Sequence, residues 1–137
     1  MLEALLEVLE ACLEWVKSDM IKNISVVAFY VSNRRKSARW FKDKLGFKVV
    51  DNYGHWLTVA PKSARKGTVE LHLCETKKSK LEPGNTGISF AVDNLDRSYK
   101  EMIKKGVKFT KNPRDEGWGK YAMIRDPDGN EFWLFQY

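Results

Sequence analysis

The chain has 137 residues, 43% of them hydrophobic and 12% aromatic, and its formal net charge is +6. This length suits one domain with a buried core, and the composition excludes both a disordered chain and, for want of a long apolar run, a membrane-spanning one. The basic residues are scattered and no nucleic-acid recognition motif lies beside them, so no nucleic-acid partner is expected.

Residues 2–17 have the spacing of an amphipathic helix. Apolar residues recur every three or four positions, with glutamates on the opposite face: Leu2, Leu5, Leu6, Leu9, Cys12, Leu13 and Val16 against Glu3, Glu7, Glu10 and Glu14. Such a helix is marginal alone in water, so we expect it to pack on this chain's own sheet or on a partner chain. Residues 1–20 carry a net −4 and the remainder about +10, so the helix is expected to face the basic body. We treat 1–20 as an addition to the main domain, 21–137.

The next segments alternate between strand and helix patterns. An apolar run is followed by Ser32 and Asn33, either of which can cap a helix. A basic amphipathic stretch comes next and ends at Gly46, a residue suited to a helix C-terminus. Three short strand patterns come next. The predicted order is β-α-β-β-β, with strands at 24–31, 47–51, 55–60 and 68–74 and a helix at 34–45.

The same order returns after a polar link at residues 75–85. Asn94 is expected to cap a helix that Gly106 ends. A turn with the sequence Asp-Pro-Asp-Gly-Asn, residues 126–130, is expected to join the last two strands into a hairpin. The predicted strands are 87–92, 107–110, 118–125 and 132–137, and the predicted helix is 94–105. The phrases KLGFKV and KKGVKF occupy matching places, which indicates an internal repeat of about 50–60 residues.

Three phrases in this order, AFYVSNRRKSARWFKDKLGFKVV, ISFAVDNLDRSYKEMIKKGVKF and GWGKYAMIRDPDGNEFWLFQ, resemble the vicinal oxygen chelate superfamily. That superfamily includes the glyoxalases, bleomycin-resistance proteins and extradiol dioxygenases. The resemblance runs from about Ile21 to Tyr137, with modules at about 21–76 and 85–137. It implies an α+β fold in which two βαβββ modules form half-barrels around a cavity, commonly completed by a homodimer.

In the enzymes of this family His or Glu side chains on four strands hold a divalent metal. Carried onto this chain, the four positions fall on Val26, Glu70, Gly87 and Trp133. Three of these residues cannot ligate a metal, and a catalytic site generally needs about three protein ligands. The resemblance therefore implies a member without a catalytic metal and without another cofactor.

Relocated ligands are the alternative. Glu70 and His72 share one face of a predicted strand, and Glu131 shares a face with Trp133. A set of Glu70, His72 and Glu131, with His55 as a fourth candidate, would suit Zn, Mn or Fe. Glu70 and His72 are also the candidate catalytic pair for a metal-free reaction, in which they would bind or move a proton. The simplest interpretation of both is an outward-facing polar pair.

Four aromatic residues fall on strands that bound the cavity in the resembled fold: Trp56, Trp118, Tyr121 and Trp133. Aromatic side chains are often only core residues. A tryptophan in place of a metal ligand, however, offers a flat apolar surface that suits an aromatic ligand. The predicted ligand-binding residues are these four together with Glu70 and His72.

The leading hypothesis is a cytoplasmic small-molecule-binding protein that holds a neutral or anionic, partly aromatic ligand. The basic body argues against a cationic ligand. A lyase, isomerase or dioxygenase using Glu70 and His72 is the second hypothesis, so whether the chain is an enzyme is left open. The third is a protein-interaction module that works through the N-terminal helix. The two cysteines, Cys12 and Cys74, form no motif and are too few for a disulfide framework.

Overall fold

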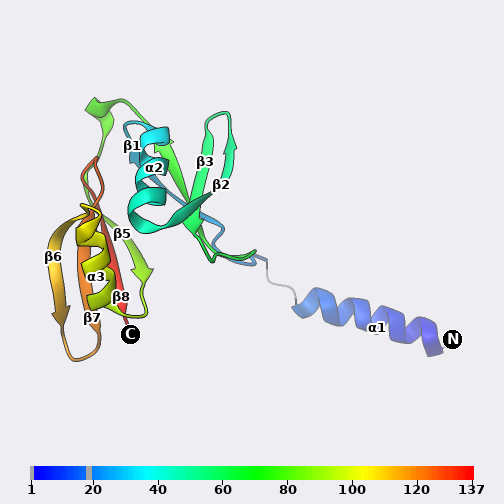
Figure 1. The fold of residues 1–137 in the computed structure, drawn as a ribbon. Coiled ribbons are helices and arrows are strands. Elements are labelled where there is room, and N and C mark those ends of the chain that lie inside the picture. Colours follow the sequence, from blue (N-terminus) through cyan, green and yellow to red (C-terminus); the bar gives the residue numbers. More distant parts are fainter. Residues whose placement is uncertain (1, 18–19) are drawn as a thin grey trace.

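The computed structural model describes residues 2–17 and 20–137 and contains two four-stranded sheets and three α-helices in those ranges (Figure 1). The elements are α1 (Leu2–Lys17), β1 (Val26–Val31), α2 (Arg34–Leu45), β2 (Phe47–Tyr53), β3 (Trp56–Pro61), β4 (Glu70–Glu75), β5 (Gly84–Ala91), α3 (Leu95–Lys104), β6 (Lys108–Asp115), β7 (Lys120–Arg125) and β8 (Asn130–Gln136). A short 3-10 turn at Lys78–Lys80 lies between the modules. The predicted α+β fold of two βαβββ modules with an added N-terminal helix is confirmed.

The helices of the two modules begin in the same way. Asn33 and Asn94 are the N-cap residues of α2 and α3, and each side chain accepts a hydrogen bond from a backbone N–H of the first turn, on Lys36 and Arg97. Gly46 ends α2 in the left-handed conformation, with a φ of 72°. The capping chemistry expected from the sequence therefore sets both helix starts and one helix end.

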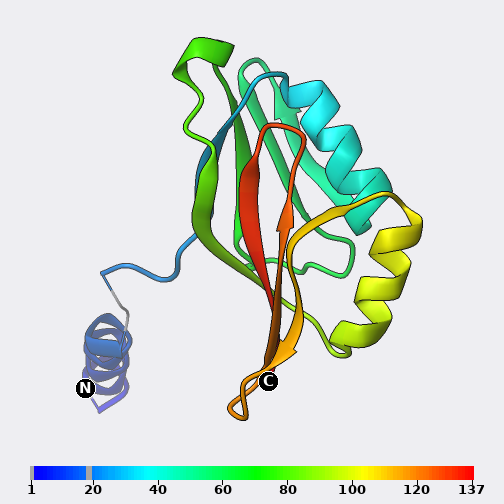
Figure 2. The ribbon, with the colours of Figure 1, turned by 90° about the vertical axis from the view of Figure 1, so that its left-hand side faces the viewer.

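In each module the first strand along the chain lies beside the fourth and runs parallel to it. Sheet A has the order β1-β4-β3-β2 and sheet B has the order β5-β8-β7-β6. Strand β1 runs parallel to β4 and β5 runs parallel to β8, while the remaining neighbours are antiparallel. Helices α2 and α3 lie along the same side of the molecule (Figure 2).

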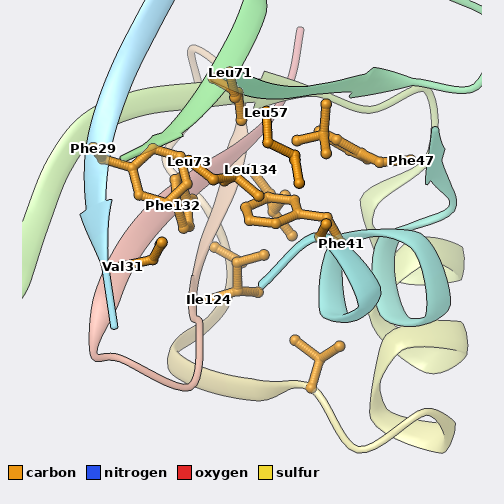
Figure 3. Packing of buried hydrophobic residues seen from close by; sticks show 14 of the residues in the cluster. Phe29, Val31, Phe41, Phe47, Leu57, Leu71, Leu73, Ile124, Phe132 and Leu134 are labelled. Carbon is orange, nitrogen blue, oxygen red and sulfur yellow. The ribbon is translucent and has the colours of Figure 1, made fainter. Parts of the chain in front are cut away.

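One hydrophobic core joins the two modules. Phe29 of β1 and Phe132 of β8 meet edge to face with ring centroids 5.1 Å apart, and Phe41 of α2 lies 5.8 Å from Phe132 (Figure 3). Phe47 and Phe90 make a further contact between the modules at 5.4 Å. Aromatic pairs at these separations add to the stabilisation that burial provides. The two sheets thus bury one face each in a common core.

The turn between β7 and β8 ties the second module to the first. The carboxylate of Asp128 accepts hydrogen bonds from the backbone N–H of Ser32 at 3.0 Å and from its hydroxyl at 2.6 Å. The side chain of Asn130 donates to the carbonyl of Tyr30 at 2.9 Å. The sequence predicted the turn, and the structure shows that it is also a clamp on the end of β1.

Asp126 is the buried centre of this turn. Its carboxylate accepts from the backbone N–H groups of Asp128 and Asn130 and from the Asn130 side chain, at 2.8–2.9 Å. Burial raises the pKa of Asp126 above its ordinary value of 3.8, and the hydrogen bonds from Asn130 oppose that rise. The charge of Asp126 is therefore held in place at a cost in desolvation.

The N-terminal helix forms where the sequence predicts it, but α1 stands apart from the two sheets (Figure 1). Side chains of its apolar face are exposed, among them Leu2 at 75% and Leu9 at 57%. Packing on the chain's own sheet is therefore not observed for residues 2–12. Within the described ranges no helix has both the length and the apolar character needed to cross a membrane.

Candidate functional site

The predicted site residues lie on the sheet faces that point away from the common core. Side chains alternate along β1, so Phe29 and Val31 are buried while Ala28 and Tyr30 are exposed. Strand β8 alternates likewise, with Phe132 and Leu134 in the core. Two outward faces result, one on each sheet.

On sheet A, a hydrogen-bond chain fixes Glu70. The hydroxyl of Thr58, which is fully buried, donates to Glu70 Oε1 at 2.6 Å. The same hydroxyl accepts from the backbone N–H of Asp51 at 3.1 Å. Val26 is the β1 neighbour of Glu70, so the first two family metal positions are adjacent. The carboxylate is held in one orientation beside an apolar side chain.

His72 and Trp56 form a stacked pair on the same face. Their ring centroids are 4.2 Å apart and their planes are 29° from parallel. His72 Nε2 lies 3.4 Å from the carbonyl oxygen of His55, within hydrogen-bonding distance. The face of sheet A therefore combines a carboxylate, an imidazole and an indole, a surface that can both stack against a flat ring and exchange hydrogen bonds.

The outward face of sheet B carries a continuous aromatic surface. Trp133 and Phe135 of β8 stack with centroids 5.6 Å apart and planes 16° from parallel. Tyr121 of β7 lies 5.4 Å from Trp133 and 6.0 Å from Phe135. We call this set, together with Trp118 and Tyr137 at its margin, the aromatic platform; Trp118 lies 6.2 Å from Tyr121 and Tyr137 lies 5.8 Å from Phe135.

Polar neighbours fix the position of Trp133. Its indole N–H donates to Asn85 Oδ1 at 3.1 Å, and the same oxygen accepts from the backbone N–H of Gly87 at 2.8 Å. The ammonium of Lys111 lies over the indole, 5.4 Å from the ring centroid, which is a favourable cation–π distance. The platform therefore has a cation over one of its rings, that of Trp133.

The structure separates the predicted site residues into two sets. Trp56, Glu70 and His72 lie together on sheet A, and Tyr121 and Trp133 lie together on sheet B, as does Glu131. Trp118 was predicted to begin a strand, but β7 begins at Lys120, so Trp118 lies in the segment before that strand and stacks on Tyr121. Across residues 2–17 and 20–137, no three His, Cys, Asp or Glu side chains converge as metal ligands. Glu70 and His72 are thus not joined by Glu131 within one chain.

Several residues of these faces were not predicted from the sequence. Phe135 is central to the platform, and the alternation of Trp133, Phe135 and Tyr137 along one strand was a usable signal. Thr58 contacts Glu70 and Lys111 contacts Trp133. Both contacts join residues that are distant in the sequence, so no local sequence pattern predicts them.

Comparison with known proteins identifies the family. The model of the glyoxalase/bleomycin resistance protein/dioxygenase superfamily matches residues 23–134. The chain therefore belongs to this superfamily. The match leaves out residues 1–22, which include the whole of α1.

Individual relatives agree with this assignment. The uncharacterized protein YetH of Bacillus subtilis is 32% identical over 120 residues, which cover 84% of this chain and 98% of YetH. A superfamily member from Sphaerobacter thermophilus is 30% identical with a TM-score of 0.74, over 87% of this chain and all of that one. TnmS3, an antibiotic-binding protein from Streptomyces sp. CB03234, is 27% identical with a TM-score of 0.75, over 87% of this chain and 98% of TnmS3.

Proposed function

We propose that this protein binds a small, flat, partly aromatic molecule and holds it without a catalytic metal. The aromatic platform is the observation that carries the proposal. Three of its rings, Tyr121, Trp133 and Phe135, lie within 6.0 Å of one another on a sheet face turned away from the core. Rings on such a face leave apolar surface open to water, and stacking against a ligand ring would remove that surface from water.

The charge around the platform favours a neutral or anionic ligand. Lys111 lies directly over Trp133, and the chain outside residues 1–20 carries about +10. A cationic ring would be repelled at this position, while a carboxylate or sulfonate on the ligand would meet the ammonium. The likeness to TnmS3, which binds an antibiotic, supports a binding role of this kind.

The two outward faces belong together in a homodimer under this proposal. Sheet A of one copy, with Trp56, Glu70 and His72, would lie opposite the aromatic platform of the second copy. Such an arrangement encloses the ligand between a hydrogen-bonding wall and a stacking wall. The dimer expected from the family resemblance would thus complete the site.

The metal chemistry of related enzymes does not fit the donors of this chain. Val26 and Gly87 offer no ligand atom, and the indole N–H of Trp133 donates to Asn85. Glu70 alone remains of the four family positions. We therefore derive no metal-dependent step, and expect metal analysis of the purified protein by mass spectrometry to give far less than one Zn, Mn, Fe or Ni per chain. One equivalent retained after dialysis would contradict the metal-free proposal.

A matched ligand series tests the binding proposal. 2-Naphthoate, 2-naphthol and 2-naphthylmethylammonium share one ring system and differ in charge. In calorimetric titrations of the intact protein, the anion and the neutral compound should bind at least about tenfold more tightly than the cation, a difference of about 1.4 kcal/mol. Trp133→Ala should weaken all three, because the stacking surface is lost.

Two controls make that test specific. Trp40→Phe changes an aromatic residue of α2 that packs edge to face on Phe41, away from the platform, and should leave affinity unchanged. Lys111→Ala should remove the preference for 2-naphthoate over 2-naphthylmethylammonium, while the affinity for 2-naphthol should be retained. Equal affinity of the Trp133→Ala variant and the wild type would rule out the platform as the binding surface.

A further inference from the structure

A groove lies between the two modules on the helix side of the sheets. It encloses about 620 Å³ between the end of α2, α3, β5 and the loop after β3. Its apolar lining includes Phe47, Val69, Ile88, Phe90, Val92 and Met102. Phe47 and Phe90 also belong to the common core or pack against it, so this groove is separate from the outward faces that carry the proposed ligand site. Val69 is 39% exposed, which leaves apolar surface open at the rim.

The rim of the groove is basic. Lys44 of α2 and Lys105 after α3 line it directly, and Glu101 is the one acidic residue among its described lining. The loop that contributes Pro61, Ser63 and Ala64 also carries three cations, at Lys62, Arg65 and Lys66. An apolar occupant with an acidic flank would match both the floor and the rim.

Helix α1 has these two properties. Leu2, Leu5, Leu6 and Leu9 form an exposed apolar stripe, each at least 50% accessible, and Cys12 continues it. Glu3, Glu7 and Glu10 follow the other side of the helix. An amphipathic helix of 16 residues is marginal in water without a surface to cover its apolar stripe. The helix and the groove are thus two uncovered apolar surfaces in one chain, and the residues that flank them carry opposite charges, acidic on α1 and basic at the rim of the groove.

The connection between them is short. The side chain of Asn23 donates to the carbonyl of Gly67 at 3.3 Å, and Glu70 N–H donates to the carbonyl of Ser25. Thr68 and Val69, between those two contacts, line the groove. The chain from Lys17 to Asn23 advances six residues and spans up to about 20 Å when extended. The end of α1 can therefore reach the groove of its own chain.

We propose that α1 docks with its leucine stripe in this groove of its own chain and acts as a strap across the two modules. Leucine side chains fill the apolar floor, and the glutamates face the lysines of the rim. The position of α1 apart from the sheets is the open state of this strap. Docking would cover the junction of the modules from the side opposite the proposed ligand faces.

Cross-linking tests the location. In a Cys74→Ser background, the natural Cys12 on the stripe is paired with Val69→Cys or Met102→Cys in the groove, and a short bismaleimide is added to the full-length chain. Intramolecular linkage, identified by peptide mass spectrometry and independent of protein concentration, is expected for at least one groove variant. Asn112→Cys, exposed on β6, is the matched control and should not link to Cys12.

Hydrogen exchange of the unmodified chain tests the docking itself. The amides of α1 should exchange roughly tenfold or more slowly than those of a Leu6→Glu variant, because docked helices open less often than isolated ones. The neighbouring Glu7→Gln substitution, on the acidic side, should retain that protection. Fast exchange in the wild type would overturn the proposal. Protection that grows with protein concentration, or linkage between chains, would assign the leucine stripe to a second copy and overturn it as well.

Discussion

At the residue scale, Trp133 shows how one side chain changes the chemistry of a shared fold. The family resemblance carries one of the four metal-ligand positions onto this residue, which lies on β8. Its ring nitrogen donates to Asn85 and the Lys111 ammonium lies 5.4 Å from its ring centroid, so the position holds a large aromatic surface with a nearby positive charge. The fold remains that of the family, and under the proposed function the site would favour stacking over chelation.

Asp128 should be important for stability, because it joins the turn after β7 to the residue that follows β1. Asp128→Ala removes two charge-assisted hydrogen bonds to Ser32, and we expect a loss of about 2–3 kcal/mol in the free energy of unfolding. Urea unfolding measures it. Asp93→Ala, at an exposed position, should change stability by less than about 0.5 kcal/mol.

A double-mutant cycle with Ser32→Ala identifies the cause. If the hydroxyl bond to Asp128 accounts for much of the loss, the two substitutions should couple by more than about 0.5 kcal/mol. Simple additivity would show that the clamp between turn and strand contributes little.

Asp126 should give stability an unusual dependence on pH. Its pKa in the folded protein is raised by burial above the ordinary 3.8, so between these two values the folded state binds more protons than the unfolded state. The contribution of Asp126 to stability therefore rises as the pH falls through this window and is lost as the pH increases. Asp126→Asn removes the titration, along with acceptors for Asn130.

We consequently expect the stability advantage of the wild type over Asp126→Asn to grow between neutral pH and about pH 4. Urea unfolding of both proteins at several pH values gives this difference directly. A difference that shrinks toward acid would mean that the pKa of Asp126 is lowered on folding.

At the scale of elements, local sequence signals predicted most of the architecture. The cap at Asn94, the glycine after α2 and the final turn act within a few residues, and each is where the sequence predicts it. For α2 the sequence left Ser32 and Asn33 open, and the structure has Asn33 as the cap. Strand β6 was predicted only to Thr110 but continues to Asp115. Lys111, Asn112 and Pro113 resemble a turn, yet β6 is an edge strand with two shifts in register, where proline is tolerated.

The site was predictable only in part, because its geometry depends on contacts between distant segments. Alternation places Glu70 beside His72 on one face and Trp133 on another, and both placements follow from the strand period. The distribution of these residues over two separate faces depends on how the sheets pack through Phe29 and Phe132. Periodicity within a strand carries no information about that packing.

Gly46 should be required for the end of α2. Its φ of 72° lies in the left-handed region, and a Cβ at this position would have no atom within 4 Å, so any cost of substitution comes from the backbone. Gly46→Ala should lower the free energy of unfolding by roughly 1–2 kcal/mol, and Gly46→Asn by less, because asparagine tolerates this conformation better. Thermal unfolding of the two variants checks whether Gly46→Ala is the less stable. If steric clashes caused the loss, the larger side chain of Gly46→Asn would be the more destabilising.

At the scale of the whole molecule, the open faces lead us to expect a homodimer. Light scattering should give twice the chain mass of 15.9 kDa at micromolar concentrations. Trp118, 64% exposed at the margin of the platform, would lie in the interface, so Trp118→Asp should shift the mass toward the monomer. Lys100→Asp on the exposed side of α3 should not. A monomer mass for the wild type at every dilution would remove the composite site from the proposal.

The irregular course of β6 also limits how copies of this protein can join. A regular edge strand offers a row of free N–H and C=O groups from which a sheet can grow into a neighbouring molecule, and repeated growth of this kind produces fibres. Pro113 has no N–H, and the shifts at Lys111 and Arg114 break the row further. The addition of a further strand to sheet B at its β6 edge is therefore disfavoured. The aromatic surface of sheet B can thus be open to a ligand while its β6 edge is a poor template for the addition of a strand from a neighbouring molecule.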